Sequence, residues 1–408
     1  MSEVLDTFLA KWQGDAPVYL LASAIGLLVV ALAGWPVRRL AHRLGAIDVP
    51  RGRHAHRQAT PRLGGIAVLV GVIAATLVGF GALAARRPEV LEQSPHFGLV
   101  LVVATGVCLL GVFDDIRSLS PRTKLCGLGI AGAMLAFGGV RIDFIELPWL
   151  GKFACGPLAG LATVVWVLAC SNAVNLIDGV DGVGAGTSLV ACFALALVAH
   201  GMGDPATATA FIAIAGACGG FLLHNREPAR LFLGDSGSLL LGFLMAALSA
   251  GGCTKRATAI LLVAALFALA LPLLDSTQAF VRRFRRADLT LGRGRLLAKL
   301  RATAIGDREH IHHRLLVRGH SHRRVARTLS LCTLVPGLSA LFLLPSGHTG
   351  WLTLCAAGLA STVVLWRLAA MPSDLKPTPT TAEKDLILPS SPPRRTPRVR
   401  RARQTESV

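Results

Sequence analysis

Long apolar stretches alternate with short polar segments along most of this chain of 408 residues. Many of the apolar stretches reach the roughly 17–25 residues that an α-helix needs to cross a bilayer. A β-barrel would instead show apolar and polar positions alternating over short segments. The pattern predicts an all-α, polytopic integral membrane protein with about eleven transmembrane helices. We expect these spans near residues 18–35, 63–84, 97–113, 124–140, 156–171, 185–200, 207–224, 237–250, 258–280, 328–344 and 350–369.

The segments between the predicted spans fall alternately on the two sides of the membrane, and one side is strongly basic. Only 7 of the 42 Lys and Arg residues lie in the segments 1–17, 85–96, 141–155, 201–206, 251–257 and 345–349. The others lie in the segments of the opposite side or at the ends of spans. Because cytoplasmic loops carry the excess of Lys and Arg, we expect the N-terminus outside and the C-terminus in the cytoplasm.

Net charge and cysteine usage narrow the classes of function. A soluble protein with a net charge of +19 would suggest nucleic-acid binding, but the loop positions of the basic residues explain this charge by topology. We therefore expect no nucleic-acid partner. The nine cysteines are scattered, mostly within apolar stretches, and none forms a C-x-x-C motif. They are typical of small core residues, not of a zinc site or a disulfide framework.

Composition changes near residue 372. Residues 1–372 form the predicted membrane domain, and residues 373–408 are rich in Pro, Ser, Thr and Arg, which is typical of a disordered basic tail, here cytoplasmic. The polar motifs all lie on the predicted cytoplasmic side. The segments that carry them are 36–62, 114–123, 172–184, 225–236 and 281–327.

The segment 172–184 places four amide and carboxylate side chains between two apolar stretches: Asn172, Asn175, Asp178 and Asp181. Polar groups at a membrane boundary must be solvated, paired or bound to a metal. The three-residue spacing within each pair would bring its members to one face of a helix, and such oxygens suit a hard cation or the edges of a sugar or base. Helix capping beside glycine turns would account for the same residues.

Two other segments carry carboxylates beside basic or small residues. Asp114 and Asp115 precede Lys124, and carboxylates can hold a divalent cation or act as a base while a lysine meets a phosphate. Asp235 lies where small residues open a span, which suits a phosphate or a metal, and Phe232 could stack on a base. A solvated acidic turn, a helix cap and a core phenylalanine are the structural alternatives.

Two longer segments are basic. The first contains Arg53 and His56, which could hold phosphate beside a glycine-containing turn. The other ends in three histidines and an arginine, which suit anion and sugar-hydroxyl recognition: His310, His312, His313 and Arg314. Ordinary positive-inside loops would explain both segments without a ligand.

Taken together, these motifs resemble the polyprenyl-phosphate N-acetylhexosamine-1-phosphate transferases, which are glycosyltransferase family 4. The resemblance covers residues 18–370. It is carried by Asp114-Asp115 with Ser120-Pro121 and Lys124, by Asn172, Asn175, Asp178 and Asp181, by Asn225, Pro228-Ala229 and Phe232 to Ser238, by His310-Ile-His312-His313-Arg314, and by Asp48, Pro50, Arg53, His56, Pro61 and Gly64-Gly65.

The resemblance implies a multi-pass enzyme of the inner (plasma) membrane with its active site on the cytoplasmic face. Such an enzyme transfers N-acetylglucosamine-1-phosphate, or a related N-acetylhexosamine-1-phosphate, from the UDP-sugar to undecaprenyl or another polyprenyl phosphate and releases UMP. The reaction begins the synthesis of lipid-linked envelope glycans, such as cell-wall polymers or lipopolysaccharide. The resemblance also implies Mg²⁺, with Mn²⁺ as an alternative, and leaves a homodimer open.

The resemblance further implies roles for individual residues. Asp114 and Asp115 would be the catalytic carboxylates, and Asn175 and Asp235 the metal ligands. The expected substrate-binding residues are Lys124, Asn172, Asp178, Asp181, Phe232, His310, His312, His313 and Arg314, and the expected phosphate-binding residues are Arg53 and His56.

Two other functions stay open. The His-Ile-His-His pattern favours the branch that uses UDP-GlcNAc, with phospho-N-acetylmuramoyl-pentapeptide transferase as the alternative within the family. A polytopic transporter or flippase is the alternative outside it. A transporter should carry ionisable residues in mid-span, where Asp275 is the main example, whereas the motifs here gather at one face.

Overall fold

The computed structural model describes residues 2–49, 59–94, 96–147, 151–251, 255–291, 311, 315–316, 320–339, 360 and 367. Internal contacts divide the chain into a unit of Met1–Ala370 and a unit of Met371–Val408. The second unit contains the predicted tail and lies outside the described residues, so its disorder stays a prediction.

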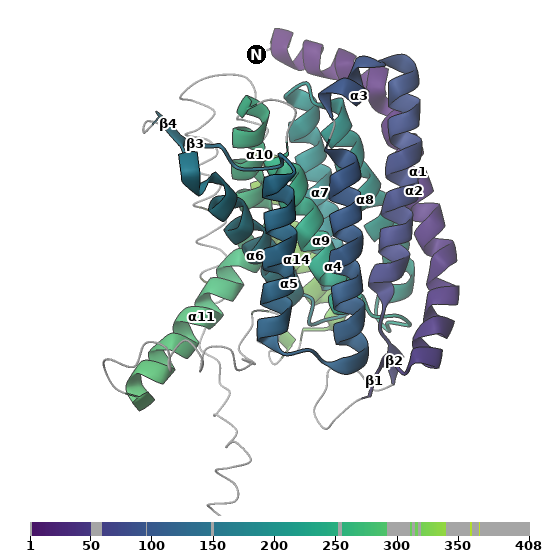
Figure 1. The fold of residues 1–408 in the computed structure, drawn as a ribbon. Coiled ribbons are helices and arrows are strands. Elements are labelled where there is room, and N and C mark those ends of the chain that lie inside the picture. Colours follow the sequence, from purple (N-terminus) through teal and green to yellow (C-terminus); the bar gives the residue numbers. More distant parts are fainter. Residues whose placement is uncertain are drawn as a thin grey trace, which may run out of the picture. The chain divides into compact units, whose positions relative to one another are not determined.

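Helices dominate the described residues (Figure 1). They are α1 (Ser2–Leu44), α2 (Gly64–Arg86), α3 (Glu89–Gln93), α4 (Phe97–Arg117), α5 (Pro121–Phe137), η1 (Gly156–Leu158), α6 (Ala159–Ile177), α7 (Val183–Gly201), α8 (Pro205–Asn225), α9 (Gly234–Ala250), α10 (Lys255–Ala268), α11 (Ala270–Leu291) and α14 (His322–Ser339). Two short antiparallel hairpins, β1 (Ile47–Asp48) with β2 (Thr60–Pro61) and β3 (Phe144–Leu147) with β4 (Gly151–Ala154), add a little strand to the predicted all-α fold.

Six of the described helical segments are long and apolar enough to cross a membrane, and the bent pair α10 and α11 would make a seventh. The structure is therefore that of a helical membrane protein, as predicted. The expected spans at 124–140 and 237–250 correspond to α5 and α9, which have 17 residues each. The span expected at 350–369 lies almost entirely outside the described residues. The total of eleven spans and the orientation of the termini stay predictions.

Helix α1 has 43 residues and contains Pro17 and Pro36, which bracket the span predicted for residues 18–35. Such a helix would be about 65 Å long, roughly twice the hydrocarbon thickness of a bilayer. Its N-terminal part turns away from the remainder (Figure 1). Buried Asp15 pairs with Arg87 at 3.1 Å, and the Tyr19 hydroxyl hydrogen-bonds His200 Nδ1 at 2.8 Å. These contacts fasten α1 to the end of the bundle away from the polar motifs.

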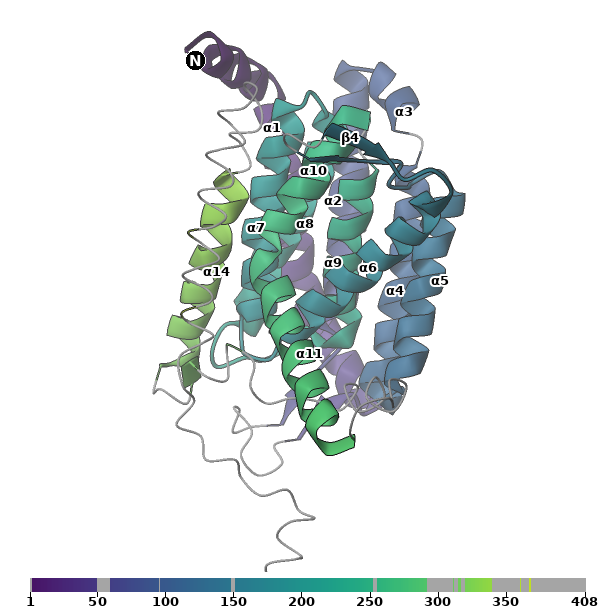
Figure 2. The same cartoon turned by 90° about the vertical axis from the view of Figure 1, so that its left-hand side faces the viewer.

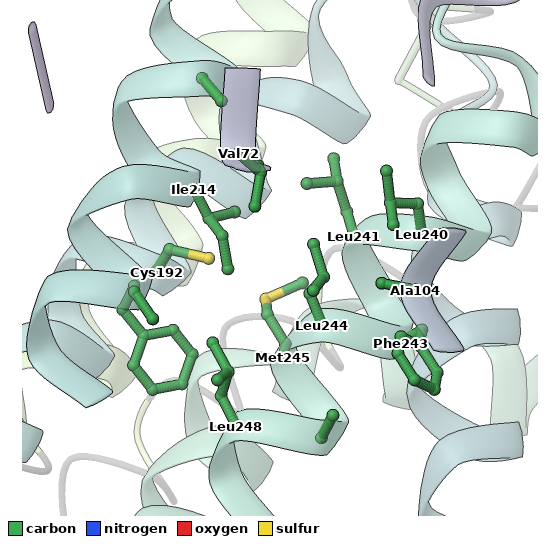
Figure 3. Packing of buried hydrophobic residues seen from close by; sticks show 14 of the residues in the cluster. Val72, Ala104, Cys192, Ile214, Leu240, Leu241, Phe243, Leu244, Met245 and Leu248 are labelled. Atoms are coloured by element: carbon green, nitrogen blue, oxygen red, sulfur yellow. The ribbon is translucent and has the colours of Figure 1, made fainter. Parts of the chain in front are cut away.

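Helix α9 lies at the centre of the bundle, between α4, α6 and α2, and all its residues from Ser236 to Ala250 are buried. Figure 3 shows its leucines, Phe243 and Met245 together with Val72 of α2, Ala104 of α4 and Ile214 of α8. A helix that is apolar on every side belongs in a core, and within a membrane protein close van der Waals packing against neighbouring helices holds it there. Helix α9 therefore holds a fixed position, and so does the polar motif at its N-terminus.

Glycines let the neighbouring helices approach the start of α9. A methyl group at Gly65 of α2 or at Gly111 of α4 would collide with the backbone of Ser236. A methyl group at Gly242 would collide with Ser171 of α6 in the same way. The close approach brings the ends of α4 and α6, which carry the predicted carboxylates and amides, next to Asp235.

Candidate functional site

The site is built around the Lys124 ammonium group, which bridges two carboxylates from different helices. Lys124 Nζ lies 2.7 Å from Asp235 Oδ2 and 3.2 Å from Asp114 Oδ2. Asp114 is in the last turn of α4, Lys124 in the first turns of α5, and Asp235 at the start of α9. The turn between α4 and α5 ends at Ser120, whose hydroxyl accepts the Thr123 N–H, as its place before Pro121 favours. The sequence therefore folds Lys124 back onto Asp114.

Asn175 joins the same cluster from the last turns of α6. Its side-chain amide donates to Asp235 Oδ1 at 3.0 Å and to the Ser238 hydroxyl at 2.8 Å. The structure thus brings together four of the predicted residues, which are separated by up to 121 positions in the chain: Asp114, Lys124, Asn175 and Asp235.

Asp115 has a different environment from Asp114, although the two are neighbours in α4. Its two carboxylate oxygens accept the backbone N–H groups of Asp235 at 2.9 Å and of Ser236 at 3.1 Å. Helix α9 has no side-chain cap of its own, since Leu233 precedes it. Asp115 therefore satisfies the N-terminal donors of α9 from another helix, and its negative charge is favourable at that end of the helix. Gly234 makes room, because a methyl group there would collide with this carboxylate.

The turn between α6 and α7 carries Asp178 and Asp181 and is fastened to the segment after α8. Asp181 Oδ2 accepts the Ala229 N–H at 3.0 Å, and the Gly182 N–H donates to Asn225 Oδ1 at 2.9 Å. Gly182 has a φ of 78°, a left-handed backbone that glycine adopts readily. These bonds bring the two predicted segments 172–184 and 225–236 side by side.

Asp178 is half-buried and lies against Gly184, where a methyl group would collide with its carboxylate. Burial raises the pKa of Asp178 well above its ordinary value, and the negative charges of Asp235, Asp115 and Asp181 add to this effect. A hydrogen bond from the Gly184 backbone opposes the shift. Asp178 therefore holds a proton more readily than an ordinary aspartate does.

Asn172 and Phe232 take positions at the edge of the cluster. The Asn172 amide donates to the Leu168 carbonyl at 2.7 Å, one turn back along α6. The backbone of Phe232 pairs with the chain that enters α2: its N–H donates to the Pro61 carbonyl at 2.8 Å, and its carbonyl accepts the Gly64 N–H at 3.0 Å. The β1–β2 hairpin is thereby attached to the start of α9.

The structure does not describe Arg53, His56, His310, His312, His313 or Arg314, so the predictions for these residues remain open. Two apolar neighbours of the histidines are described. Ile311 and Leu315 are buried in a small cluster with Ile177 and Val183, which flank the turn between α6 and α7. The Ile311 N–H donates to the buried carboxylate of Asp275 at 3.0 Å. The side chain of Asp275, the residue expected in mid-span for a transporter, thus accepts a backbone N–H from a residue 36 positions further along the chain.

Sequence reasoning gave no role of their own to three residues that hold the site together. Ser238 accepts from Asn175, Asn225 links two loops, and Arg62 pairs with Asp48 at 2.6 Å to close the β1–β2 hairpin. Although burial opposes the charge on Arg62, Asp48 raises the pKa of its guanidinium, with further contributions from Asp115 and Asp235. Arg62 lies in a segment where basic residues are expected for topology alone, so its role could be seen only from its place in the fold.

The described residues contain no group of three or more His, Cys, Asp or Glu side chains arranged to hold a metal ion. The groups at the centre of the site that could hold a cation are the carboxylates of Asp114 and Asp235 and the amide of Asn175, whose nitrogen donates to Asp235 in this structure. Oxygen donors of this kind suit a hard cation such as Mg²⁺, which binds through one or two carboxylates together with substrate phosphates. Two carboxylates already converge on one positive group, Lys124, so the donor set fits a cation at this position.

A search for related proteins identified the same family as the motifs. The family model described as "Glycosyl transferase family 4" matches residues 97–252, which include α4 to α9. The relatives include the "Probable undecaprenyl-phosphate N-acetylglucosaminyl 1-phosphate transferase" of Bacillus subtilis, 34% identical over 335 residues that cover 82% of this chain and 86% of the relative.

Two further relatives bear on specificity. The "Decaprenyl-phosphate N-acetylglucosaminephosphotransferase" of Mycobacterium tuberculosis is 34% identical over 74% of this chain and 77% of its own. The "Phospho-N-acetylmuramoyl-pentapeptide-transferase" of Desulforudis audaxviator is 36% identical over 61% of this chain and 80% of its own. The long matches to these relatives and the carboxylate, lysine and asparagine cluster agree, and we conclude that the chain belongs to glycosyl transferase family 4.

Proposed function

We propose that this protein transfers N-acetylglucosamine-1-phosphate from UDP-GlcNAc to a polyprenyl phosphate such as undecaprenyl phosphate and releases UMP. The observation that carries the proposal is the cluster of Asp114, Lys124, Asn175 and Asp235, in a chain whose long matches include GlcNAc-1-phosphate transferases. The product would be the first lipid-linked intermediate in the synthesis of an envelope glycan. The excess of basic residues in the segments around this cluster supports a cytoplasmic active site in the inner membrane.

The reaction joins two anions, so the protein must supply positive charge. A phosphate oxygen of the lipid attacks the β-phosphorus of UDP-GlcNAc, a new P–O bond forms, and the bond from that phosphorus to the bridging oxygen breaks as UMP leaves. Placement in line and electrostatic stabilisation are what such a transfer chiefly needs. Lys124 is held by Asp114 and Asp235 at the centre of the site and would offset the charge of the phosphates.

The hydrogen bonds of the aspartates favour direct attack by the lipid phosphate. Asp114 Oδ1 accepts the Leu119 N–H at 2.6 Å and its Oδ2 faces Lys124, while both oxygens of Asp115 accept backbone N–H groups. A carboxylate held in this way is a poor nucleophile. In our proposal Asp114 orients Lys124, Asp115 positions the start of α9, and the lipid phosphate is the nucleophile.

Divalent metal is part of the proposal. Asp235 and Asn175 would hold Mg²⁺, or Mn²⁺ in its place, with Asp114 beside them, once the Lys124 ammonium moves toward the substrate phosphates. When bound, the ion would neutralise the diphosphate and make UMP a better leaving group. Asn175 then has a double role, because its amide can present either its nitrogen or its oxygen to the centre of the site.

The remaining predicted residues would form the walls of the substrate site. The turn with Asp178 and Asp181, next to Phe232, is proposed to bind uridine. A carboxyl group that holds a proton, as the raised pKa of Asp178 favours, can donate a hydrogen bond to a ribose or base oxygen. His310, His312, His313 and Arg314 are proposed for the sugar and diphosphate, and Arg53 and His56 for phosphate.

The proposal is tested by measuring UMP release from membranes that contain the protein, a polyprenyl phosphate and Mg²⁺, with either UDP-GlcNAc or UDP-MurNAc-pentapeptide as donor. We expect release with UDP-GlcNAc. Asp235→Asn should lower the rate by roughly 10²–10³-fold, because charge stabilisation at the reacting centre is lost. Asp143→Asn, which changes an exposed ion pair with Arg141 far from the site, is the matched control.

Each contrary result has a defined meaning. Release of UMP only with UDP-MurNAc-pentapeptide would move the protein to the other branch of the family. The absence of UMP with both donors would refute the transferase proposal. Full activity of the Asp235→Asn variant would refute the role of this cluster as the reacting centre.

A further inference from the structure

A groove with a volume of about 1000 Å³ lies beside the site, between α7, α8 and α14. Its lining is basic at one end and apolar at the other. The basic end is formed by Arg226 and Arg230, which follow α8, and by Arg327 of α14, while Leu222, Leu223 and Leu331 belong to the apolar wall. Figure 2 shows α14 and α7 side by side along the bundle.

Along both α8 and α14, the arginines lie nearer the end of the bundle that carries the site, and the leucines lie further from it. On α8, Leu222 and Leu223 lie about one turn before Arg226, at the C-terminal end of the helix. On α14, which runs the opposite way, Arg327 lies one turn before Leu331. Residues three or four positions apart share a helix face. Both helices thus place arginine at the end of the bundle that carries the site and leucine about one turn further from that end. A lipid has the same order, with its charged headgroup at the membrane surface and its acyl chains further in.

The lining of the groove contains four arginines and two carboxylates, so its net charge is positive. Arg323 is held by Glu227, with its side chain donating to the Glu227 carbonyl at 2.9 Å. Within the described part of the chain, Arg226, Arg230 and Arg327 form no ion pair, and all three are exposed. The second lining carboxylate, Asp181, accepts the Ala229 N–H. The groove keeps a net positive charge after both carboxylates are counted, and three arginines that converge on it suit a phosphate group.

The apolar wall faces the lipid phase if α8 crosses the membrane as its length and composition indicate. Leu223 is 50% exposed and Leu331 is 62% exposed, so an acyl chain could cover both. The groove differs from the reacting centre, because Asp114, Asp115 and Asp235 are absent from its lining. A lipid phosphate held here would not be in place for transfer.

We propose that this groove binds an anionic glycerophospholipid of the surrounding membrane, with its phosphate on Arg226, Arg230 and Arg327 and one acyl chain along Leu223 and Leu331. Asp181 and Gly182 form part of the groove and belong to the turn that is proposed to bind uridine. The bound lipid would therefore lie against the back of that turn. The inference requires membrane embedding but not transferase activity.

The test uses the full chain in nanodiscs of phosphatidylcholine that contain a small fraction of fluorescent phosphatidylglycerol. Binding is measured as energy transfer from a donor dye on the protein to the fluorescent phosphatidylglycerol. Replacement of all three arginines, in R226Q/R230Q/R327Q, should weaken phosphatidylglycerol binding at least about tenfold. The control R38Q/R39Q/R43Q removes the same charge from exposed α1 and should leave binding unchanged. The variant R226K/R230K/R327K keeps the charge and should retain most of the binding, which separates loss of charge from loss of fold.

Competition distinguishes the sources of the phosphate. Unlabelled phosphatidylglycerol should displace the probe, whereas inorganic phosphate and undecaprenyl phosphate should not at matched concentrations. Displacement by inorganic phosphate would show that the groove binds anions in general and not a lipid. Displacement by undecaprenyl phosphate would show that the groove belongs to the substrate site. Either result would overturn the proposal. The proposal would also be overturned if R38Q/R39Q/R43Q weakened phosphatidylglycerol binding equally, or if folded R226Q/R230Q/R327Q still bound phosphatidylglycerol like wild type. UMP release measured on the same samples reports separately on the proposed function.

Discussion

At the scale of residues, two adjacent carboxylates have different neighbours because of helix geometry. Successive side chains on a helix point about 100° apart, so Asp114 faces Lys124 while Asp115 faces the start of α9. The motif could be found in the sequence, but these separate contacts could not. The same applies to Asn172 and Asn175: three positions apart on α6, one bonds back to Leu168 and the other reaches Asp235.

Asp178 gives a prediction for the dependence of stability on pH. Its pKa is raised in the folded protein, so the native state binds this proton more tightly than the unfolded chain. The proton on Asp178 therefore contributes its full stabilisation of the folded state below the unfolded pKa of about 3.9. This contribution is lost as the pH rises through the pKa of the folded state. Asp178→Asn mimics the protonated form. The variant should therefore show a higher thermal midpoint than wild type at neutral pH, with a difference that fades below about pH 4.

The check is a thermal unfolding series in detergent across pH for wild type, Asp178→Asn and Asp6→Asn. Asp6 is exposed, so its variant should follow the wild-type curve. A lower midpoint for Asp178→Asn at neutral pH would mean that the ionised carboxylate is the stabilising form, contrary to this account.

At the scale of elements, α9 depends on a neighbouring helix for its N-terminus. Leu233 cannot cap it, and the Asp115 carboxylate of α4 instead accepts the N–H groups of the second and third residues of α9, Asp235 and Ser236. The close packing of Gly65 and Gly111 on Ser236 leaves little room for a water molecule to replace it. The start of α9, and with it Asp235, is therefore positioned by tertiary contacts.

Asp115→Ala should destabilise the protein by about 1–3 kcal/mol, because two buried backbone donors lose their acceptors. Equilibrium unfolding in mixed micelles measures this loss. Glu92→Ala, at an exposed position of α3, is the control and should change stability by less than about 0.5 kcal/mol. An Asp115→Ala variant with wild-type stability would contradict the capping role and would leave only a direct chemical role for this carboxylate.

At the scale of the whole molecule, the polar motifs of four helices and their connecting turns gather at one end of the bundle. The β3–β4 hairpin lies at the other end (Figure 1). The contacts of Asp15 and Tyr19 with Arg87 and His200 lie at the C-terminal ends of α2 and α7. The bundle is thus divided into an end that carries the proposed reacting centre, here called the reactive end, and an end that fastens α1. From the positive-inside rule, we propose that the reactive end lies in the cytoplasm.

Cysteine labelling tests this orientation. In a background whose native cysteines are replaced by Ala, Arg117→Cys marks the reactive end and Ala154→Cys marks the β3–β4 end; both positions are exposed. A membrane-impermeant maleimide added to intact cells should label Cys at 154 but not at 117, whereas both should react after lysis. The reverse pattern would invert the proposed topology.

Much of this protein follows from its sequence alone. The length and polarity of the apolar stretches determine a helical membrane protein, because a bilayer accepts only segments whose backbone polar groups are satisfied internally. The motifs around Asp114, Asn175 and Asp235 identify the family, which the relatives confirm. The predicted span at 18–35 also lies within the limits set by Pro17 and Pro36 of α1.

Only the tertiary structure decides which side chains meet. Lys124 bridges Asp114 and Asp235, and Asp115 caps α9. Arginines of α14 and of the segment after α8 line one groove. These contacts form because helices far apart in the sequence pack closely, in several places at glycines. Local sequence sets the direction of a side chain around its own helix axis, but not the partner that it faces. That partner is determined by the packing of the apolar surfaces of the whole bundle, with α9 at its centre.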